Sequence, residues 1–173
     1  EFDRALELMP QNQLDPRILV VEITESDIRT EKRWPISDAT IARVLKKLQS
    51  DRAKTIGLDL HRDVQQPPGQ AELLQQLQAP NVISIYKLGD GNDSSGVAPP
   101  PGVPKEQIGF NDFILDPDGV VRRNFMYAFQ KKDKFYSFSL LVSLTYLKDR
   151  HLSFQVNPNS VSYTHLTLPT ILL

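Results

Sequence analysis

The chain has 173 residues, a formal net charge of -1 and no cysteine. The length suffices for one domain with a substantial core, and no apolar run approaches the roughly 20 residues that cross a bilayer. The balanced charge excludes a basic nucleic-acid-binding face, and the absence of cysteine excludes disulfides, a thiol nucleophile and a cysteine zinc site.

The first third of the chain predicts a helix, a strand and a second helix. Apolar residues at helical spacing predict a short helix over residues 1–9. The continuous apolar run at 18–23 predicts a strand that is covered on both faces, as in a parallel sheet. Ser37 is the expected N-cap of the next helix. We expect that helix to bury one apolar stripe, made of Ile41, Val44, Leu45 and Leu48.

The middle third continues the alternation of strands and helices. Residues 55–60 and 82–86 predict strands, and residues 70–78 predict the helix between them. Strand, helix and strand at this spacing predict βαβ units and a parallel sheet. The proline- and glycine-rich residues 87–107 predict a long surface loop.

A β-hairpin is predicted over residues 110–129. Its arms are rich in β-branched and aromatic residues, and Asp116-Pro117-Asp118-Gly119 has the composition of a type I turn with Gly119 in the left-handed conformation. This turn makes Asp116 the partner of Val120. One face of the hairpin would then carry Asp112, Ile114, Arg122 and Asn124, and the core face would carry Phe113, Leu115, Val121, Arg123 and Phe125. A register shifted by one residue would pair Asp112 with Arg123 instead. The polar cross-strand cluster of Asp112, Arg122 and Asn124 is either exposed surface or the border of a binding site.

Residues 130–134 predict a charged connection, and residues 137–147 predict a helix that is apolar nearly all round and therefore buried. The predicted fold is α/β and three-layered, with a mixed sheet of parallel βαβ units and an antiparallel hairpin. Residues 161–173 resemble a translated sequencing adapter, and we expect them to contribute nothing to the fold.

Two groups of side chains are candidates for chemistry. Asp59, His61 and Asp63 alternate at the end of a predicted strand, where a metal ion or general-base chemistry is conceivable and where a simple capping role is the alternative. No nucleophile elbow and no glycine-rich phosphate loop accompanies them. Arg33 and Trp34 precede the capped helix. Trp34 could cover a strand end as a large apolar side chain, or the two residues could form the wall of a pocket.

The order of these motifs resembles the CHASE type-two domain, the cyclases/histidine kinases associated sensory extracellular domain. The matching segments are DPRILVVEIT, RWPISDATIARVLKKL, TIGLDLHRD, GFNDFILDPDGVVRRN and YSFSLLVSL, of which GFND…DPDGVVRR is the most specific. The resemblance implies that residues 1–160 are the N-terminal part of such a sensory domain, that the domain is incomplete, and that residues 161–173 are extraneous.

The resemblance further implies a non-catalytic, extracytoplasmic signal-input domain of a bacterial receptor in the inner or plasma membrane. The output would be an adenylate cyclase, a histidine kinase or a serine/threonine kinase. An unknown small molecule or protein would be the signal, flanking helices would reach the membrane, a second copy of the chain is a candidate partner, and no cofactor is expected. The alternatives are a scaffold that only dimerises, or a small α/β hydrolase or metal-dependent enzyme using Asp59, His61 and Asp63. The candidate ligand-binding residues are Arg33, Trp34, Asp59, His61, Arg62, Asn111, Asp112, Arg122 and Arg123.

Overall fold

The computed structural model describes residues 15–89, 96–122, 125–130 and 133–150. The chain divides into two units, Glu1–Trp34 and Pro35–Leu173. The helix predicted over residues 1–9 and the predicted extraneous residues 161–173 lie outside the described residues. Within the described ranges, no helix combines the length and the apolarity that crossing a bilayer requires.

The first unit contains one described helix, α2 (Glu25–Glu31). A capping box begins it: Thr24 Oγ1 accepts a hydrogen bond from the Asp27 backbone, and the Asp27 carboxylate accepts one from the Thr24 backbone. The strand predicted at 18–23 is wrong, because these residues join no β-ladder in the described part of the chain. An apolar run becomes a strand only where it packs on a pleated surface, and here four residues are more than half exposed: Ile18, Leu19, Val20 and Val21.

The second unit is built on a parallel sheet in the order β1-β2-β3. The strands are β1 (Ile56–Leu58), β2 (Val82–Tyr86) and β3 (Ile108–Phe110). Before β1 runs α3 (Asp38–Ser50), and α4 (Gln70–Leu77) connects β1 to β2, which confirms the predicted βαβ unit. The 3₁₀ helix η1 (Lys105–Gln107) leads the predicted loop into β3.

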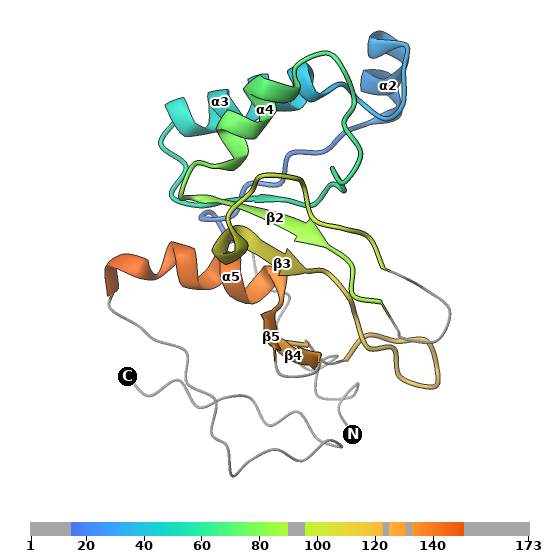
Figure 1. Ribbon diagram of the computed structural model, residues 1–173, viewed down its shortest axis with the longest axis vertical. Helices are drawn as coiled ribbons and strands as arrows, with labels where there is room; N and C mark the ends of the chain where they lie inside the picture. The colour runs from blue at the N-terminus through green and yellow to red at the C-terminus, as the bar shows by residue number, and fades with distance from the viewer. Residues whose placement is uncertain (1–14, 90–95, 123–124, 131–132, 151–173) are drawn as a thin grey trace. The chain divides into compact units, whose positions relative to one another are not determined.

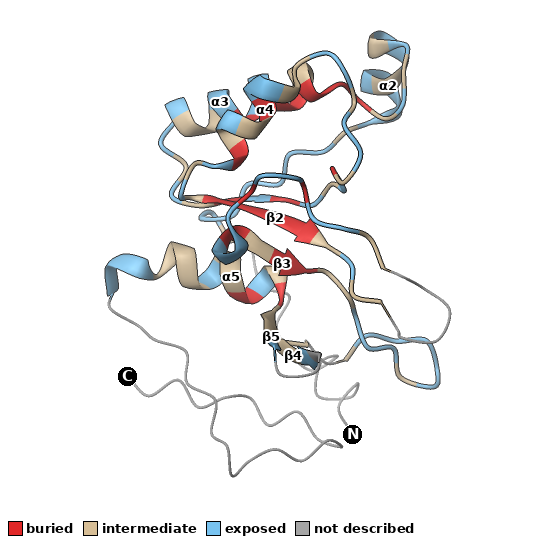
Figure 2. Cartoon of the chain, viewed as in Figure 1, coloured by how far each residue is buried: buried red, intermediate tan, exposed pale blue. Residues whose placement is uncertain are grey.

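Helices cover both faces of this sheet. Figure 1 shows α3 and α4 on one side and α5 (Phe138–Tyr146) on the other. The α5 side depends on two glycines: a Cβ at Gly109 would lie 2.5 Å from the Phe138 Cα atom, and one at Gly57 would lie 2.6 Å from the Phe138 ring. The buried residues gather along β2, β3 and the inner sides of α3 and α4 (Figure 2). The predicted three-layer α/β class is therefore confirmed.

The start of α3 follows the prediction closely. Ser37 is the N-cap and its Oγ accepts a hydrogen bond from the Thr40 backbone at 3.3 Å. The buried stripe contains Ile41 and Leu45 as predicted, but Val44 is 37% exposed and Ala42 is buried in its place. The stripe is thus rotated by part of a turn.

The hairpin prediction is right in its turn and wrong in its strands. The Asp116 backbone donates to Val120 O at 3.0 Å, and Gly119 is left-handed with a φ of +79°. The arm before the turn, however, is continuous only over β3, which is parallel to β2, and further along it Ile114 takes part in an isolated bridge. Three side chains predicted for the core face are exposed, Phe113 by 68%, Leu115 by 62% and Val121 by 49%, whereas Phe125 is half-buried and its ring lies 5.2 Å from that of the buried Phe110.

The antiparallel hairpin lies further along the chain, as β4 (Tyr127–Gln130) and β5 (Asp133–Tyr136). Residues 130–134, predicted as a charged connection, therefore include parts of both strands. An isolated parallel bridge between Phe110 and Ser137 links the end of β5 to β3. Ser137 then caps α5 by accepting from the Leu140 backbone at 3.2 Å. Leu140 is buried, but the other apolar residues of α5 are half-buried, so the helix is less enclosed than predicted.

Candidate functional site

The carboxyl ends of the three parallel strands meet at one edge of the sheet, which is where open α/β sheets bind ligands. Asn111 follows β3 and donates through Nδ2 to Asp59 Oδ1, which follows β1, at 3.3 Å. Asp112 Oδ2 accepts a hydrogen bond from the Leu88 backbone, just after β2, at 2.9 Å. We call this edge, formed by Asp59, Tyr86, Leu88, Asn111 and Asp112, the carboxyl edge.

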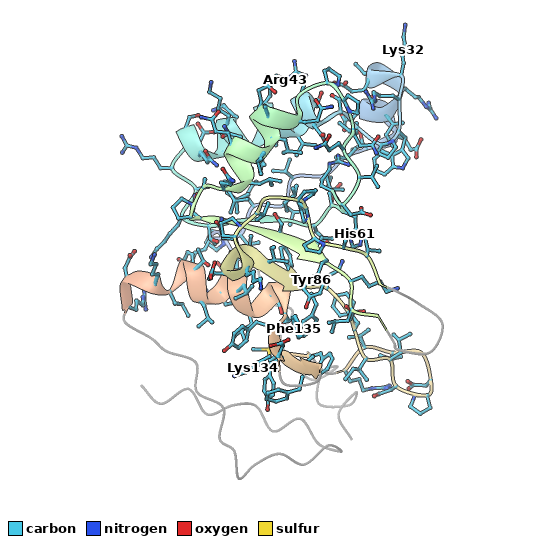
Figure 3. The ribbon with its side chains drawn as sticks, viewed as in Figure 1. Lys32, Arg43, His61, Tyr86, Lys134 and Phe135 are labelled. Atoms are coloured by element: carbon cyan, nitrogen blue, oxygen red, sulfur yellow. The ribbon has the colours of Figure 1, made fainter. Side chains whose placement is uncertain are left out.

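Tyr86 is the last residue of β2, and its hydroxyl is the group of the carboxyl edge with the fewest hydrogen bonds. Its ring lies 6.2 Å from the Phe135 ring, and the two side chains can be followed in Figure 3. Its hydroxyl is buried and, among the residues that the structure describes, has no hydrogen-bond partner. Burial, with the negative charge of Asp112 as the second cause, raises the pKa of Tyr86 to about 12. A buried, neutral hydroxyl without a partner is uncommon in folded proteins and is a donor available to a ligand.

His61 and Arg62, both predicted to bind ligand, have opposite environments. His61 is exposed in the loop after β1, and its backbone carbonyl accepts from Arg62 Nη1 at 3.5 Å. Arg62 is buried, donates from Nη2 to Ile36 O at 3.0 Å, and its Nε lies 3.6 Å from Asp38 Oδ1. Arg62 is therefore part of the structure that holds the edge, not of the exposed surface that a ligand would meet.

The loop that carries these residues is fastened to the first turn of α3. The Asp38 backbone donates to Gln66 O at 2.7 Å, and the Gln66 backbone donates back to the Asp38 carboxylate at 2.9 Å. The Ala39 backbone donates to Pro68 O at 2.8 Å. These bonds satisfy amides that a helix start would otherwise leave unpaired, and they fix the loop between Asp59 and α4.

The three residues proposed for metal or base chemistry do not assemble into a site. β1 ends at Leu58, so Asp59, His61 and Asp63 lie in the loop and not along an extended strand. In the ranges that the structure describes, no three His, Asp or Glu side chains gather closely enough to hold a metal ion. The spacing in the sequence was right for one strand face, but the strand is too short to use it.

Arg122 stabilises the turn between Asp116 and Val120. Its guanidinium lies 3.1 Å from Asp116 Oδ2 and 2.7 Å from Asp118 Oδ2. The hydrogen bond from Arg122, followed by one from the Val120 backbone, holds the pKa of Asp118 at about 2. The predicted cross-strand cluster of Asp112 with Arg122 is thus absent among the described residues, and Arg123 and Asn124 lie outside them.

Arg33 and Trp34 belong to the first unit. Trp34 is 60% exposed, so it does not act as a buried plug in the described structure, and Arg33 is half-buried. Their predicted role in ligand binding stays a prediction.

The sequence interpretation missed Asp38 and Tyr86. Asp38 follows a recognisable N-cap, and the only signal for its burial is that an acid at this position suits a helix start. Its partner Arg62 is too distant in the sequence to be inferred. Tyr86 had a clearer signal, because it is the last residue of an otherwise apolar strand and so had to lie at the carboxyl edge.

Comparison with known proteins gives one informative match. No curated protein and no solved structure matches the chain. The model of the CHASE2 domain family matches residues 1–171, which is nearly the whole chain. The division at residue 160 stays a prediction. Because this match covers nearly the whole chain, the chain belongs to the CHASE2 domain family, a family of sensory domains.

Proposed function

We propose that this chain is the non-catalytic, extracytoplasmic signal-input domain of a bacterial transmembrane receptor. The receptor's output would be an adenylate cyclase, a histidine kinase or a serine/threonine kinase. Membership of a sensory family supports the signal-input role. The observation that carries a binding role is the carboxyl edge, where polar groups that follow the three strands contact one another and Tyr86 has a buried hydroxyl.

The chemistry of the carboxyl edge suits recognition better than catalysis. A phenol whose pKa is about 12 stays protonated at neutral pH, so Tyr86 donates a hydrogen bond and is poorly matched to proton transfer. Asp112 accepts from a backbone amide and Asp59 from the Asn111 amide, so each carboxylate is oriented by a residue that follows another strand. Groups held in this way by strands are preorganised to bind a ligand.

The receptor that contains this chain provides the test of the signalling role. Asn111→Ala and Asp112→Ala remove the two contacts between strand ends, and Arg122→Gln is the matched control because it weakens a turn elsewhere in the chain. We expect both edge variants to change the output activity of the receptor at a melting temperature close to that of the wild type. The control should signal normally. Unchanged output from both edge variants would contradict the proposal.

The extracytoplasmic placement has its own test. The chain has no cysteine, so a single cysteine at the exposed Lys46 of α3 is a clean reporter. In a receptor with any other cysteines replaced, a membrane-impermeant maleimide added to intact cells should label Lys46→Cys. Labelling that requires lysed cells would contradict the placement.

A further inference from the structure

One face of the β4–β5 hairpin gathers three aromatic rings and one ammonium group. The register pairs Tyr127 with Tyr136 and Phe129 with Lys134. Directly opposed residues share a face, and side chains alternate along each strand, so all four side chains lie on the same side of the hairpin. We call this set the aromatic face.

The opposite side of the hairpin packs on the sheet. Phe135 alternates with Lys134 and lies 6.2 Å from the Tyr86 ring. In Figure 3, Phe135 is nearer to Tyr86 and Lys134 lies beyond it. Phe129, on the aromatic face, is 56% exposed. The aromatic face is therefore partly accessible to solvent, while the Phe135 side anchors the hairpin.

Within the aromatic face, two of the rings lie close to the ammonium group of Lys134. Lys134 Nζ lies 5.2 Å from the centroid of Tyr127 and 4.8 Å from that of Tyr136. Phe129 meets Tyr127 edge to face at 5.7 Å and 83°, which fixes the orientation of that ring. A cation within about 6 Å of a ring centroid is attracted by the negative face of the ring. Two rings that share one ammonium form the arrangement that proteins use to recognise organic cations.

We propose that the aromatic face is a binding site for organic cations, in particular quaternary ammonium groups, and that Lys134 occupies it when no such ligand is present. The lysine ammonium is compact and strongly hydrated, and it sits on a flexible stem that can swing into solvent. A quaternary ammonium group is less hydrated, so it loses less on contact with the rings. This inference does not depend on the signalling role proposed above.

Replacing Lys134 removes the ammonium group from the aromatic face and gives the direct test. Tetramethylammonium chloride is titrated into the full chain while the upfield shift of its N-methyl protons in NMR spectra reports contact with aromatic rings, with sodium chloride keeping the ionic strength constant. We expect Lys134→Ala to bind the probe roughly tenfold more tightly than the wild type. Lys54→Ala is the matched control, because Lys54 lies over one ring, that of Tyr146 at 4.9 Å, among the described residues. Lys54→Ala should not raise the affinity for the probe by a comparable factor.

Ring substitutions then locate the binding. In the Lys134→Ala background, Tyr136→Phe keeps an aromatic ring and should keep the gain, whereas Tyr136→Leu should abolish it. Circular dichroism shows whether each variant is folded, and Tyr127→Leu gives the same test if Tyr136→Leu unfolds. The proposal is overturned if Lys134→Ala binds no more tightly than the wild type, if Lys54→Ala gains equally, or if a folded leucine variant retains the gain.

Discussion

Asp38 and Arg62 form a buried ion pair, and we predict that replacing one of them destabilises the chain more than replacing the other. After Arg62→Met, the Asp38 carboxylate still accepts from the Gln66 backbone at 2.9 Å and lies in the first turn of α3, where the helix dipole favours negative charge. After Asp38→Asn, a guanidinium that is 6% exposed loses its carboxylate partner and keeps carbonyl acceptors such as Ile36 O.

These two environments determine how much each substitution lowers the free energy of unfolding. Removing one partner of a buried ion pair costs about 3–5 kcal/mol, and a favourable helix end offsets up to about 2 kcal/mol. We therefore expect Asp38→Asn to lower the free energy of unfolding by about 3–5 kcal/mol and Arg62→Met by about 1–3 kcal/mol. The double variant leaves no buried charge and should lose less than the sum, with a coupling of about 1–3 kcal/mol.

Urea unfolding at neutral pH, followed by circular dichroism, gives these differences from the midpoints if the slopes agree. A double variant that is additive within about 0.5 kcal/mol would refute the reasoning, since it would show that the two charges do not interact. A larger loss for Arg62→Met than for Asp38→Asn would refute the assigned role of the helix end.

Three further predictions follow from single contacts. Gly109→Ala should lower stability by about 1–3 kcal/mol in thermal unfolding, because its Cβ would meet the backbone of α5, which cannot rotate away. Arg122→Gln should raise the pKa of Asp118 from about 2 towards 3.8 in an NMR titration. Because that pKa is depressed in the folded chain, the turn is stabilised above pH 3.8 and this contribution is lost as the pH falls towards 2, a loss that Arg122→Gln should remove. Asp112→Asn should lower the pKa of Tyr86 only partly, as seen in tyrosinate absorbance, because burial is the larger cause of its shift.

The parts of the fold that the sequence predicted are those with local causes. Residues 82–86 form the predicted strand because a central strand is apolar on both faces and needs no other information. The turn at Asp116–Val120 is likewise specified by its own residues. The run at 18–23 is equally apolar, but a strand needs a second segment to pair with. The composition of one segment does not show whether such a partner is present.

The same distinction applies to the site. The sequence placed Asp59 near the end of a predicted strand but placed Asn111 and Asp112 within a hairpin arm. The structure ends β3 at Phe110 and brings Asn111 into contact with Asp59. The sequence could not predict that Arg62 turns inward to Asp38, because that pairing depends on the path of the loop between β1 and α4. The sequence pattern thus placed Asp59 at the carboxyl edge but identified neither the other strand ends that form this edge nor the ion pair that holds it.

Tyr86→Phe tests the central claim most directly, because it removes one buried oxygen atom and keeps the ring that packs on Phe135. Its effect is measured as the output activity of the full receptor across the conditions to which the wild type responds, with the melting temperature of the variant as control. If the carboxyl edge binds the signal, the variant should keep its stability and show a shifted or lost response. A normal response from a stable Tyr86→Phe receptor would contradict the account.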